Sequence, residues 1–147
     1  MVCVAQQSIC YGTTSDGRLE GGVKLPGKGS NFISYSRVAN IAGRTYVHSE
    51  VKNIVIAAYE VLEKSHPDKK YKYAETGKRN GGQFKPHKTH QNGLSVDFMT
   101  PMKNKDGKSV HLPTHPFNRL GYDIEFCLLY TSPSPRDLST SRMPSSA

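Results

Sequence analysis

Two histidines, a glycine and an aspartate stand close together between Phe84 and Phe98. His87, His90, Gly93 and Asp97 form the pattern H-x-x-H-x-x-G-x-x-x-D. Imidazole nitrogens and carboxylate oxygens are ligands that zinc accepts, and a catalytic zinc site combines three protein ligands with one position for water. We therefore interpret His90 and Asp97 as candidate Zn2+ ligands, with a third ligand to be found elsewhere.

The alternative is a purely structural loop, in which the histidines form hydrogen bonds and Asp97 caps a turn. Two features favour metal ligation instead. Gly93 allows the backbone to turn tightly, and the alternation over residues 94–99 predicts a strand with Asp97 on its polar face. The loop that carries the histidines can then fold back over that face. The opposite, core-facing side of this strand is predicted to hold Leu94, Val96 and Phe98.

The other histidines near the motif have less defined roles. His87 could be a ligand, a partner of a ligand, or a group that contacts the substrate or a charged intermediate, so we place it in the site without assigning ligation. His111 and His115 have a helical spacing, but Pro113 and Pro116 exclude a helix there. Exposure in a loop is the default for these two histidines, and they are minor candidates for the third ligand.

The clearest secondary-structure element is a helix from Ser49 to Ser65. Its apolar residues recur at intervals of three and four, Ser49 is a suitable N-cap, and Pro67 follows its end. His48 and His66, at its two ends, are expected to cap the helix or to face solvent. The predicted core-facing side consists of Val51, Ile54, Val55, Ala58, Val61 and Leu62.

The remaining elements are predicted to be short. Residues 70–76 alternate aromatic and polar side chains, which is typical of a strand, and the glycines of 77–82 open the loop that leads to the histidines. We expect an α+β domain with a small antiparallel sheet, one long helix covering it, and the zinc site on the open face of the sheet. Further predictions are a hairpin-like lead-in at 8–29, short elements in 32–46, a turn at 104–107, and strands at 109–112 and 120–126.

The bulk properties exclude some classes of protein. The chain has 147 residues and no apolar run long enough to span a membrane. Its N-terminus lacks the basic region of a complete signal peptide but could be the remnant of one. The net charge is +8, yet the lysines are scattered without an arginine cluster, which favours a solvated basic surface over a nucleic-acid site. Cys3, Cys10 and Cys127 form no metal-binding spacing; a Cys3–Cys10 disulfide and unpaired thiols both stay open.

The composition changes at Cys127. Residues 131–147 are rich in serine and proline and contain too few apolar residues to fold. The peptide at 127–137 matches the translation of a transposon-type sequencing adapter, and 141–147 matches the flow-cell end of that adapter. We therefore interpret 127–147 as a disordered, non-native tail, and expect the natural protein to continue differently after Phe126.

Residues 8–126 resemble the penicillin-insensitive murein endopeptidases. This family belongs to a wider group that includes lysostaphin-type peptidases, D-Ala-D-Ala carboxypeptidases and hedgehog-type zinc domains. The segment from His87 to Asp97 carries the resemblance through H-Q-x-G-x-x-x-D. Weaker support comes from Glu75-Thr-Gly77, Gly81-Gly82, 43–48 and 112–122.

The resemblance implies that His90 and Asp97 bind zinc and that His87 lines the site as a catalytic residue. The family takes its third ligand and its catalytic histidine from a later H-x-H motif, which is absent here, since no histidine follows His115. We therefore expect weak zinc binding and little or no hydrolysis by this chain. The implied substrate is the peptidoglycan cross-link between D-Ala and a diamino acid, in the periplasm or outside the cell. Penicillin would not inhibit this hydrolysis, because the family uses no serine nucleophile that penicillin could acylate.

Three alternatives stay open. A D,D-carboxypeptidase or a phage-type endolysin of the same group is the nearest. A non-catalytic module that binds the cell wall or a partner is the rival from another class. A nucleic-acid role ranks third. The sequence does not indicate an oligomeric state.

Overall fold

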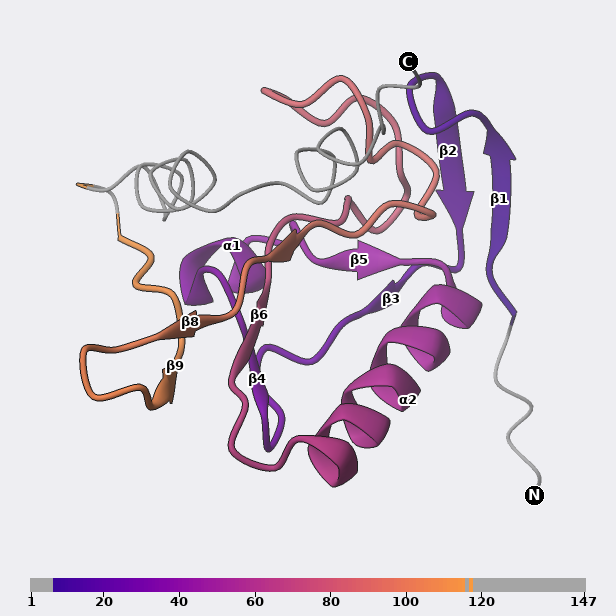
Figure 1. Cartoon of the computed structure of the whole chain (residues 1–147). Helices are drawn as coiled ribbons and strands as arrows, with labels where there is room; N and C mark the ends of the chain where they lie inside the picture. Colours follow the sequence, from indigo (N-terminus) through magenta and orange to yellow (C-terminus); the bar gives the residue numbers. More distant parts are fainter. Residues whose placement is uncertain (1–6, 116, 118–147) are drawn as a thin grey trace, which may run out of the picture. The chain divides into compact units, whose positions relative to one another are not determined.

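The computed structural model describes residues 7–115 and residue 117 (Figure 1). The chain divides into two compact units, the first ending at Leu112 and the second beginning at Pro113. In the second unit, the rings of His115 and Phe117 lie 6.2 Å apart. The strand predicted at 120–126, the tail at 127–147, and the cysteines at 3 and 127 lie outside the described residues.

A β-hairpin opens the first unit, as the glycine-rich lead-in predicts. Strands β1 (Ile9–Gly12) and β2 (Gly17–Glu20) pair antiparallel. The turn between them is closed by a 2.9 Å hydrogen bond from the amide of Thr13 to the carbonyl of Asp16. Cys10, on β1, is a free thiol.

The central sheet has three strands in the order β4 (Phe32–Ser34), β6 (Tyr71–Tyr73) and β7 (Phe98–Met99). Figure 1 labels the first two of these strands. Strand β6 pairs antiparallel with β7 but parallel with β4, so the prediction of a wholly antiparallel sheet is wrong. Parallel neighbours need a long crossover, and the chain between β4 and β6 supplies one, because it contains the two helices of the described residues.

Two further two-stranded sheets complete the described part. Strand β3 (Val23–Lys24) pairs with β5 (Tyr46–Val47), and β8 (Met102–Lys103) pairs with β9 (Ser109–Val110). The predicted turn at 104–107 connects β8 to β9, where the Asn104 side chain accepts hydrogen bonds from the amides of Asp106 (3.1 Å) and Lys108 (2.9 Å). The α+β class is therefore right, whereas the β structure is spread over several small sheets rather than one.

The described part contains a short helix, α1 (Arg37–Ile41), and a long one, α2 (Ser49–Ser65). The bounds of α2 are those predicted, but its N-cap is His48, whose Nδ1 accepts from the amide of Glu50 at 3.2 Å. The amide of Ser49 instead donates to the hydroxyl of Ser8 at 3.0 Å, and the amide of Ser8 donates back to Ser49 Oγ at 3.1 Å. A partner 41 positions away in the chain is not visible in local capping patterns.

The core-facing side of α2 differs in part from the prediction. Val55 and Tyr59 are buried, whereas Ile54 and Val61 are 66% and 64% exposed, which contradicts their predicted place in the core. The ring of Tyr59 stacks on Phe32 of β4 with centroids 4.3 Å apart. A stacked aromatic ring buries more apolar surface than an aliphatic side chain, which favours the face that carries Tyr59. The buried core cluster consists of Leu25, Phe32, Val47, Val55, Tyr59 and Tyr73.

Candidate active site

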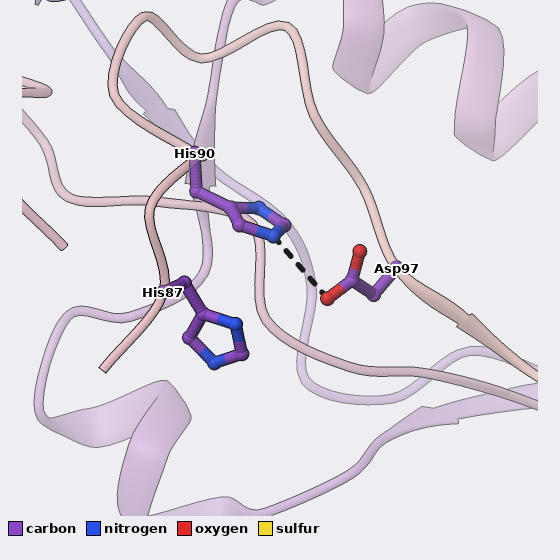
Figure 2. A group of neighbouring side chains, drawn as sticks. All are labelled: His87, His90 and Asp97. Atoms are coloured by element: carbon purple, nitrogen blue, oxygen red, sulfur yellow. Dashed lines mark ion pairs between the residues drawn. The ribbon is translucent and has the colours of Figure 1, made fainter. Parts of the chain in front are cut away.

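The fold brings the three predicted site residues together. One potential ligand atom from each of His87, His90 and Asp97 lies within 4.8 Å of the other two. Figure 2 shows the ring of His90 pointing at the carboxylate of Asp97, with Nε2 and Oδ2 3.2 Å apart, and the ring of His87 beside them. His111 does not join this group; its Nδ1 lies 3.0 Å from the carbonyl of Tyr71.

Two consecutive residues, Glu75 and Thr76, hold all three site residues. The Glu75 carboxylate contacts His87 Nε2 at 2.5 Å, and the Glu75 carbonyl accepts from the amide of Asp97 at 3.2 Å. The carbonyl of Thr76 lies 3.2 Å from His90 Nδ1. Glu75 and Thr76 are both buried and follow the middle strand of the sheet, β6, within three residues, so the sheet positions the site.

The segment that carries Asp97 differs from the predicted strand at 94–99. Only Phe98 and Met99 form regular strand, although the amide of Ala74 donates to the Asp97 carbonyl at 2.7 Å and extends the pairing. Leu94 and Phe98 are 47% and 57% exposed, so their predicted core positions are wrong. Phe98 belongs to β7, which lies at the edge of the sheet, and Leu94 precedes that strand. The Asp97 side chain is 44% exposed, as its predicted polar face requires.

The hydrogen bonds of His90 determine which ring nitrogen is available. A carbonyl oxygen only accepts hydrogen bonds, so Nδ1 of His90 carries a proton and donates a hydrogen bond to the carbonyl of Thr76. In the neutral ring, Nε2 then presents a lone pair to the Asp97 carboxylate, and two acceptors 3.2 Å apart require a proton or a cation between them. The hydrogen bond to Asp97 raises the pKa of His90 despite burial, which supplies the proton when no cation is present.

The donor set suits zinc. Two imidazoles and a carboxylate are ligands zinc accepts. Bonds of about 2.0–2.1 Å in tetrahedral geometry place ligand atoms about 3.3 Å apart. The 3.2 Å between His90 Nε2 and Asp97 Oδ2 matches this spacing. The backbone carbonyl that fixes the His90 tautomer is a typical partner of a metal-binding histidine.

Glu75 is the main site residue that the predicted set lacks. Its Oε1 accepts from Arg44 Nε at 2.5 Å and from the hydroxyl of Tyr35, and its Oε2 accepts from the other end of the Arg44 guanidinium at 2.9 Å. Burial alone would raise the pKa of the Glu75 carboxyl, but the hydrogen bonds from Arg44 and Tyr35 outweigh it and hold the pKa below its ordinary value. The sequence signals for Glu75 were its place at the end of the predicted strand at 70–76 and in one of the weaker stretches of the family resemblance.

Arg44 and Phe84 support the loop that carries the histidines. The Arg44 guanidinium lies 4.1 Å above the centroid of the fully buried Phe84 ring and donates to the carbonyl of Lys85 at 2.9 Å. The Phe84 ring in turn lies 5.8 Å from the ring of His87 and 5.6 Å from that of His90. One arginine therefore connects Glu75 to the backbone next to His87.

The comparison with protein families gives a match over most of the described chain. The model of the penicillin-insensitive murein endopeptidase family matches residues 10–116. The chain belongs to this family. A search of curated proteins finds no match. The matched segment contains His87, His90 and Asp97 together with Arg44 and Glu75, so the whole network described above lies within the murein endopeptidase region.

Gly93 has the left-handed backbone that the motif predicts, with φ of +76°. A Cβ at this position would lie 2.9 Å from the amide nitrogen of His48, which donates to the Gly93 carbonyl at 3.0 Å. Gly107, in the β8–β9 turn, has nearly the same φ of +75°, but no atom lies within 4 Å of the place that its Cβ would take. The two glycines share a left-handed backbone, which would strain any residue with a Cβ, and they differ in crowding.

Gly93→Ala is therefore expected to destabilise the protein more than Gly107→Ala. Left-handed backbone costs a residue with a Cβ about 1–2 kcal/mol, and overpacking against a fixed backbone adds about 1–3 kcal/mol. We expect about 1–2 kcal/mol for Gly107→Ala and about 2–5 kcal/mol for Gly93→Ala from these two terms. Urea unfolding measures both losses, and equal losses would contradict the crowding at Gly93.

The lowered pKa of Glu75 predicts a dependence of stability on pH. A carboxyl with a lower pKa in the folded state contributes stability above its unfolded pKa and loses it as the pH falls through the folded pKa. The free energy of unfolding should therefore drop as the pH decreases below about 4.5, the ordinary value for glutamate. Glu75→Gln should flatten this drop, whereas Glu60→Gln, at an exposed position on α2, should leave it unchanged. Unfolding followed at several pH values tests this, and an unchanged slope in Glu75→Gln would oppose it.

Proposed function

We propose that this chain has the active-site residues of a zinc-dependent endopeptidase for the peptidoglycan cross-link between D-Ala and a diamino acid, and that it hydrolyses this cross-link slowly. Membership of the murein endopeptidase family supports the substrate. The observation that carries the zinc proposal is the pair of acceptors, His90 Nε2 and Asp97 Oδ2, held 3.2 Å apart. The carbonyl of Thr76 keeps the proton of His90 on the other nitrogen.

In this proposal, His90 Nε2 and Asp97 Oδ2 bind the metal. Zinc bound there would polarise the scissile carbonyl and lower the pKa of a bound water. Asp97 is partly exposed, so substrate can reach this edge of the group, whereas His90 is 3% exposed and serves only to hold the metal.

His87 is the candidate for proton transfer. Its side chain is 26% exposed, and it contacts Glu75 through Nε2. As a general base it takes a proton from the attacking water, and as a general acid it returns that proton to the leaving amine. The Glu75 carboxylate stabilises the imidazolium that exists between these two steps, and Arg44 keeps Glu75 ionised.

The surface beside His87 suits an acidic peptide. A hollow of about 660 Å3 lies beside His87, and its lining residues are polar or basic except for Pro86. They are Ser15, Gln83, Lys85, Pro86, His87, Lys88 and Gln91. Among the described ion pairs none involves either lysine, and no carboxylate lines the hollow. Where the diamino acid is diaminopimelate, the carbon that bears the cross-linked amine also bears a carboxylate. The ammonium groups of Lys85 and Lys88 lie next to the site of proton transfer and would attract this carboxylate.

The proposed location is the cell envelope, where peptidoglycan lies. No helix in the described part of the chain is long and apolar enough to cross a membrane. This location and the cross-link specificity rest on the family and on the lysine-lined hollow.

Digestion of purified muropeptide dimers tests the proposal. We expect the zinc-loaded chain to convert cross-linked dimers slowly to monomers, because His90 and Asp97 supply fewer than the three protein ligands usual for catalytic zinc. Removal of the metal with a chelator should stop the reaction, and zinc should restore it. Cleavage that persists without metal would contradict zinc dependence. Binding of muropeptides with no cleavage would favour the cell-wall-binding module.

A further inference from the structure

The carboxylate of Glu75 makes four polar contacts, one of them with the site residue His87. Arg44 donates to both of its oxygens, Tyr35 donates to Oε1, and His87 Nε2 lies 2.5 Å from Oε2. A carboxylate offers about four acceptor sites, and these four contacts fill them. The Glu75 side chain is 11% exposed, so little space is left for water to replace any of the donors.

The contact with His87 has one consistent proton arrangement. Arg44 and the Tyr35 hydroxyl are donors in this network, so Glu75 acts as an acceptor at every contact. His87 Nε2 must then carry a proton and donate it to Oε2. In the neutral ring, the lone pair is therefore on Nδ1. Figure 2 shows Nδ1 on the side of the His87 ring that faces Asp97 and His90, with Nε2 turned away from them.

We propose that Glu75 is the positioning residue of His87: it fixes the imidazole in the Nε2–H form and turns the Nδ1 lone pair toward His90 and Asp97. Arg44 and Tyr35 hold the carboxylate that imposes this tautomer. One part of the inference rests on the proposed function, namely that the Nδ1 lone pair accepts a proton from water. A carboxylate that orients one imidazole nitrogen so that the other can accept a proton is a known arrangement in hydrolases.

The tautomer of His87 is measurable in the metal-free full chain by long-range 15N–1H NMR of histidine rings. The measurement is made at about pH 8.5, because alkaline solution favours the neutral form of an imidazole. The signals of His87 are assigned by their loss in His87→Gln. In the wild type we expect Nε2–H to exceed Nδ1–H by at least about tenfold, because the acceptor is charged. A predominantly Nδ1–H ring would overturn the proposal.

The Glu75→Gln variant tests whether Glu75 imposes the Nε2–H tautomer of His87 or whether the imidazole prefers that tautomer by itself. Two donors, Arg44 Nε and the Tyr35 hydroxyl, point at Oε1, whereas only Arg44 Nη2 and His87 point at Oε2. The glutamine oxygen should therefore take the place of Oε1, and its amide nitrogen should face His87 Nε2. The amide then donates, and the His87 proton should move to Nδ1. Tyr35→Phe is the matched control, because it removes one donor and leaves the contact between Glu75 and His87; its tautomer should stay as in the wild type. An unchanged His87 ring in a folded Glu75→Gln variant would refute the inference.

A measurement on the wild type covers the case in which Glu75→Gln does not fold. A ring proton engaged with a buried carboxylate exchanges slowly with water, so the Nε2 proton of His87 should give an observable resonance. The ring of the exposed His66 should not give one. Equal exchange at both rings would overturn the proposal. All of these readouts are taken without zinc or substrate, so a failure to bind zinc or to cleave muropeptides would count against the proposed function alone.

Discussion

His90→Ala should weaken zinc binding by more than about 100-fold, since even the loss of a residue that only supports a ligand costs about 10–100-fold. His90 provides Nε2, which lies 3.2 Å from Asp97 Oδ2, and its ring is already oriented by Thr76. With the ring removed, Asp97 keeps only His87 as a neighbour within the group. Competition with a zinc-sensitive dye measures the affinity of both proteins.

The control is His66→Ala, which removes an exposed histidine at the end of α2. Its zinc affinity should equal that of the wild type. Because His90 is buried, thermal unfolding of the metal-free variant must show that the protein still folds. Asp97→Ala supplies a second test at a half-exposed side chain, and it should also lose zinc binding. Wild-type affinity in either site variant would exclude the substituted residue as a zinc ligand.

Arg44→Ala has the largest expected effect on stability, a loss of about 3 kcal/mol, because it leaves a buried carboxylate without its charged partner. Arg44 binds both oxygens of Glu75, whose side chain is 11% exposed, and stacks on the buried ring of Phe84. The Arg44 side chain is itself 26% exposed, which places the expected loss at the lower end of the range for buried pairs. The free energy of unfolding in urea measures it.

Two further variants accompany this prediction: Arg79→Ala is the control, and Arg44→Lys tests whether the geometry of the arginine matters. Arg79→Ala removes an exposed arginine and should change the free energy of unfolding by no more than about 0.5 kcal/mol. Arg44→Lys keeps the charge but not the two parallel hydrogen bonds, so it should recover only part of the loss. Full recovery by lysine would mean that charge alone stabilises Glu75. A negligible loss in Arg44→Ala would mean that the pair of Arg44 and Glu75 does not stabilise the folded protein.

Local features of the chain were predictable from the sequence. The bounds of α2 follow from its apolar spacing and from Pro67, and the turn at 104–107 follows from its Asn, Asp and Gly. The juxtaposition of His87, His90 and Asp97 follows from a motif of eleven positions that needs one tight turn, which Gly93 provides. Spacing along the chain determines these features, since all partners belong to one short segment.

Only the tertiary structure decided the features whose partners lie far apart in the chain. The parallel pairing of β4 with β6, the face of α2 that carries Tyr59, and the bond between Ser8 and Ser49 each depend on long-range packing. The same holds for the network around Glu75, because its donors come from separate segments of the chain. The motif therefore named the residues of the candidate zinc site, whereas the fold selected the carboxylate that orients His87. The periodicity of a sequence predicts which residues face the same way on a helix or strand, but it does not predict hydrogen bonds between segments that are distant in the chain.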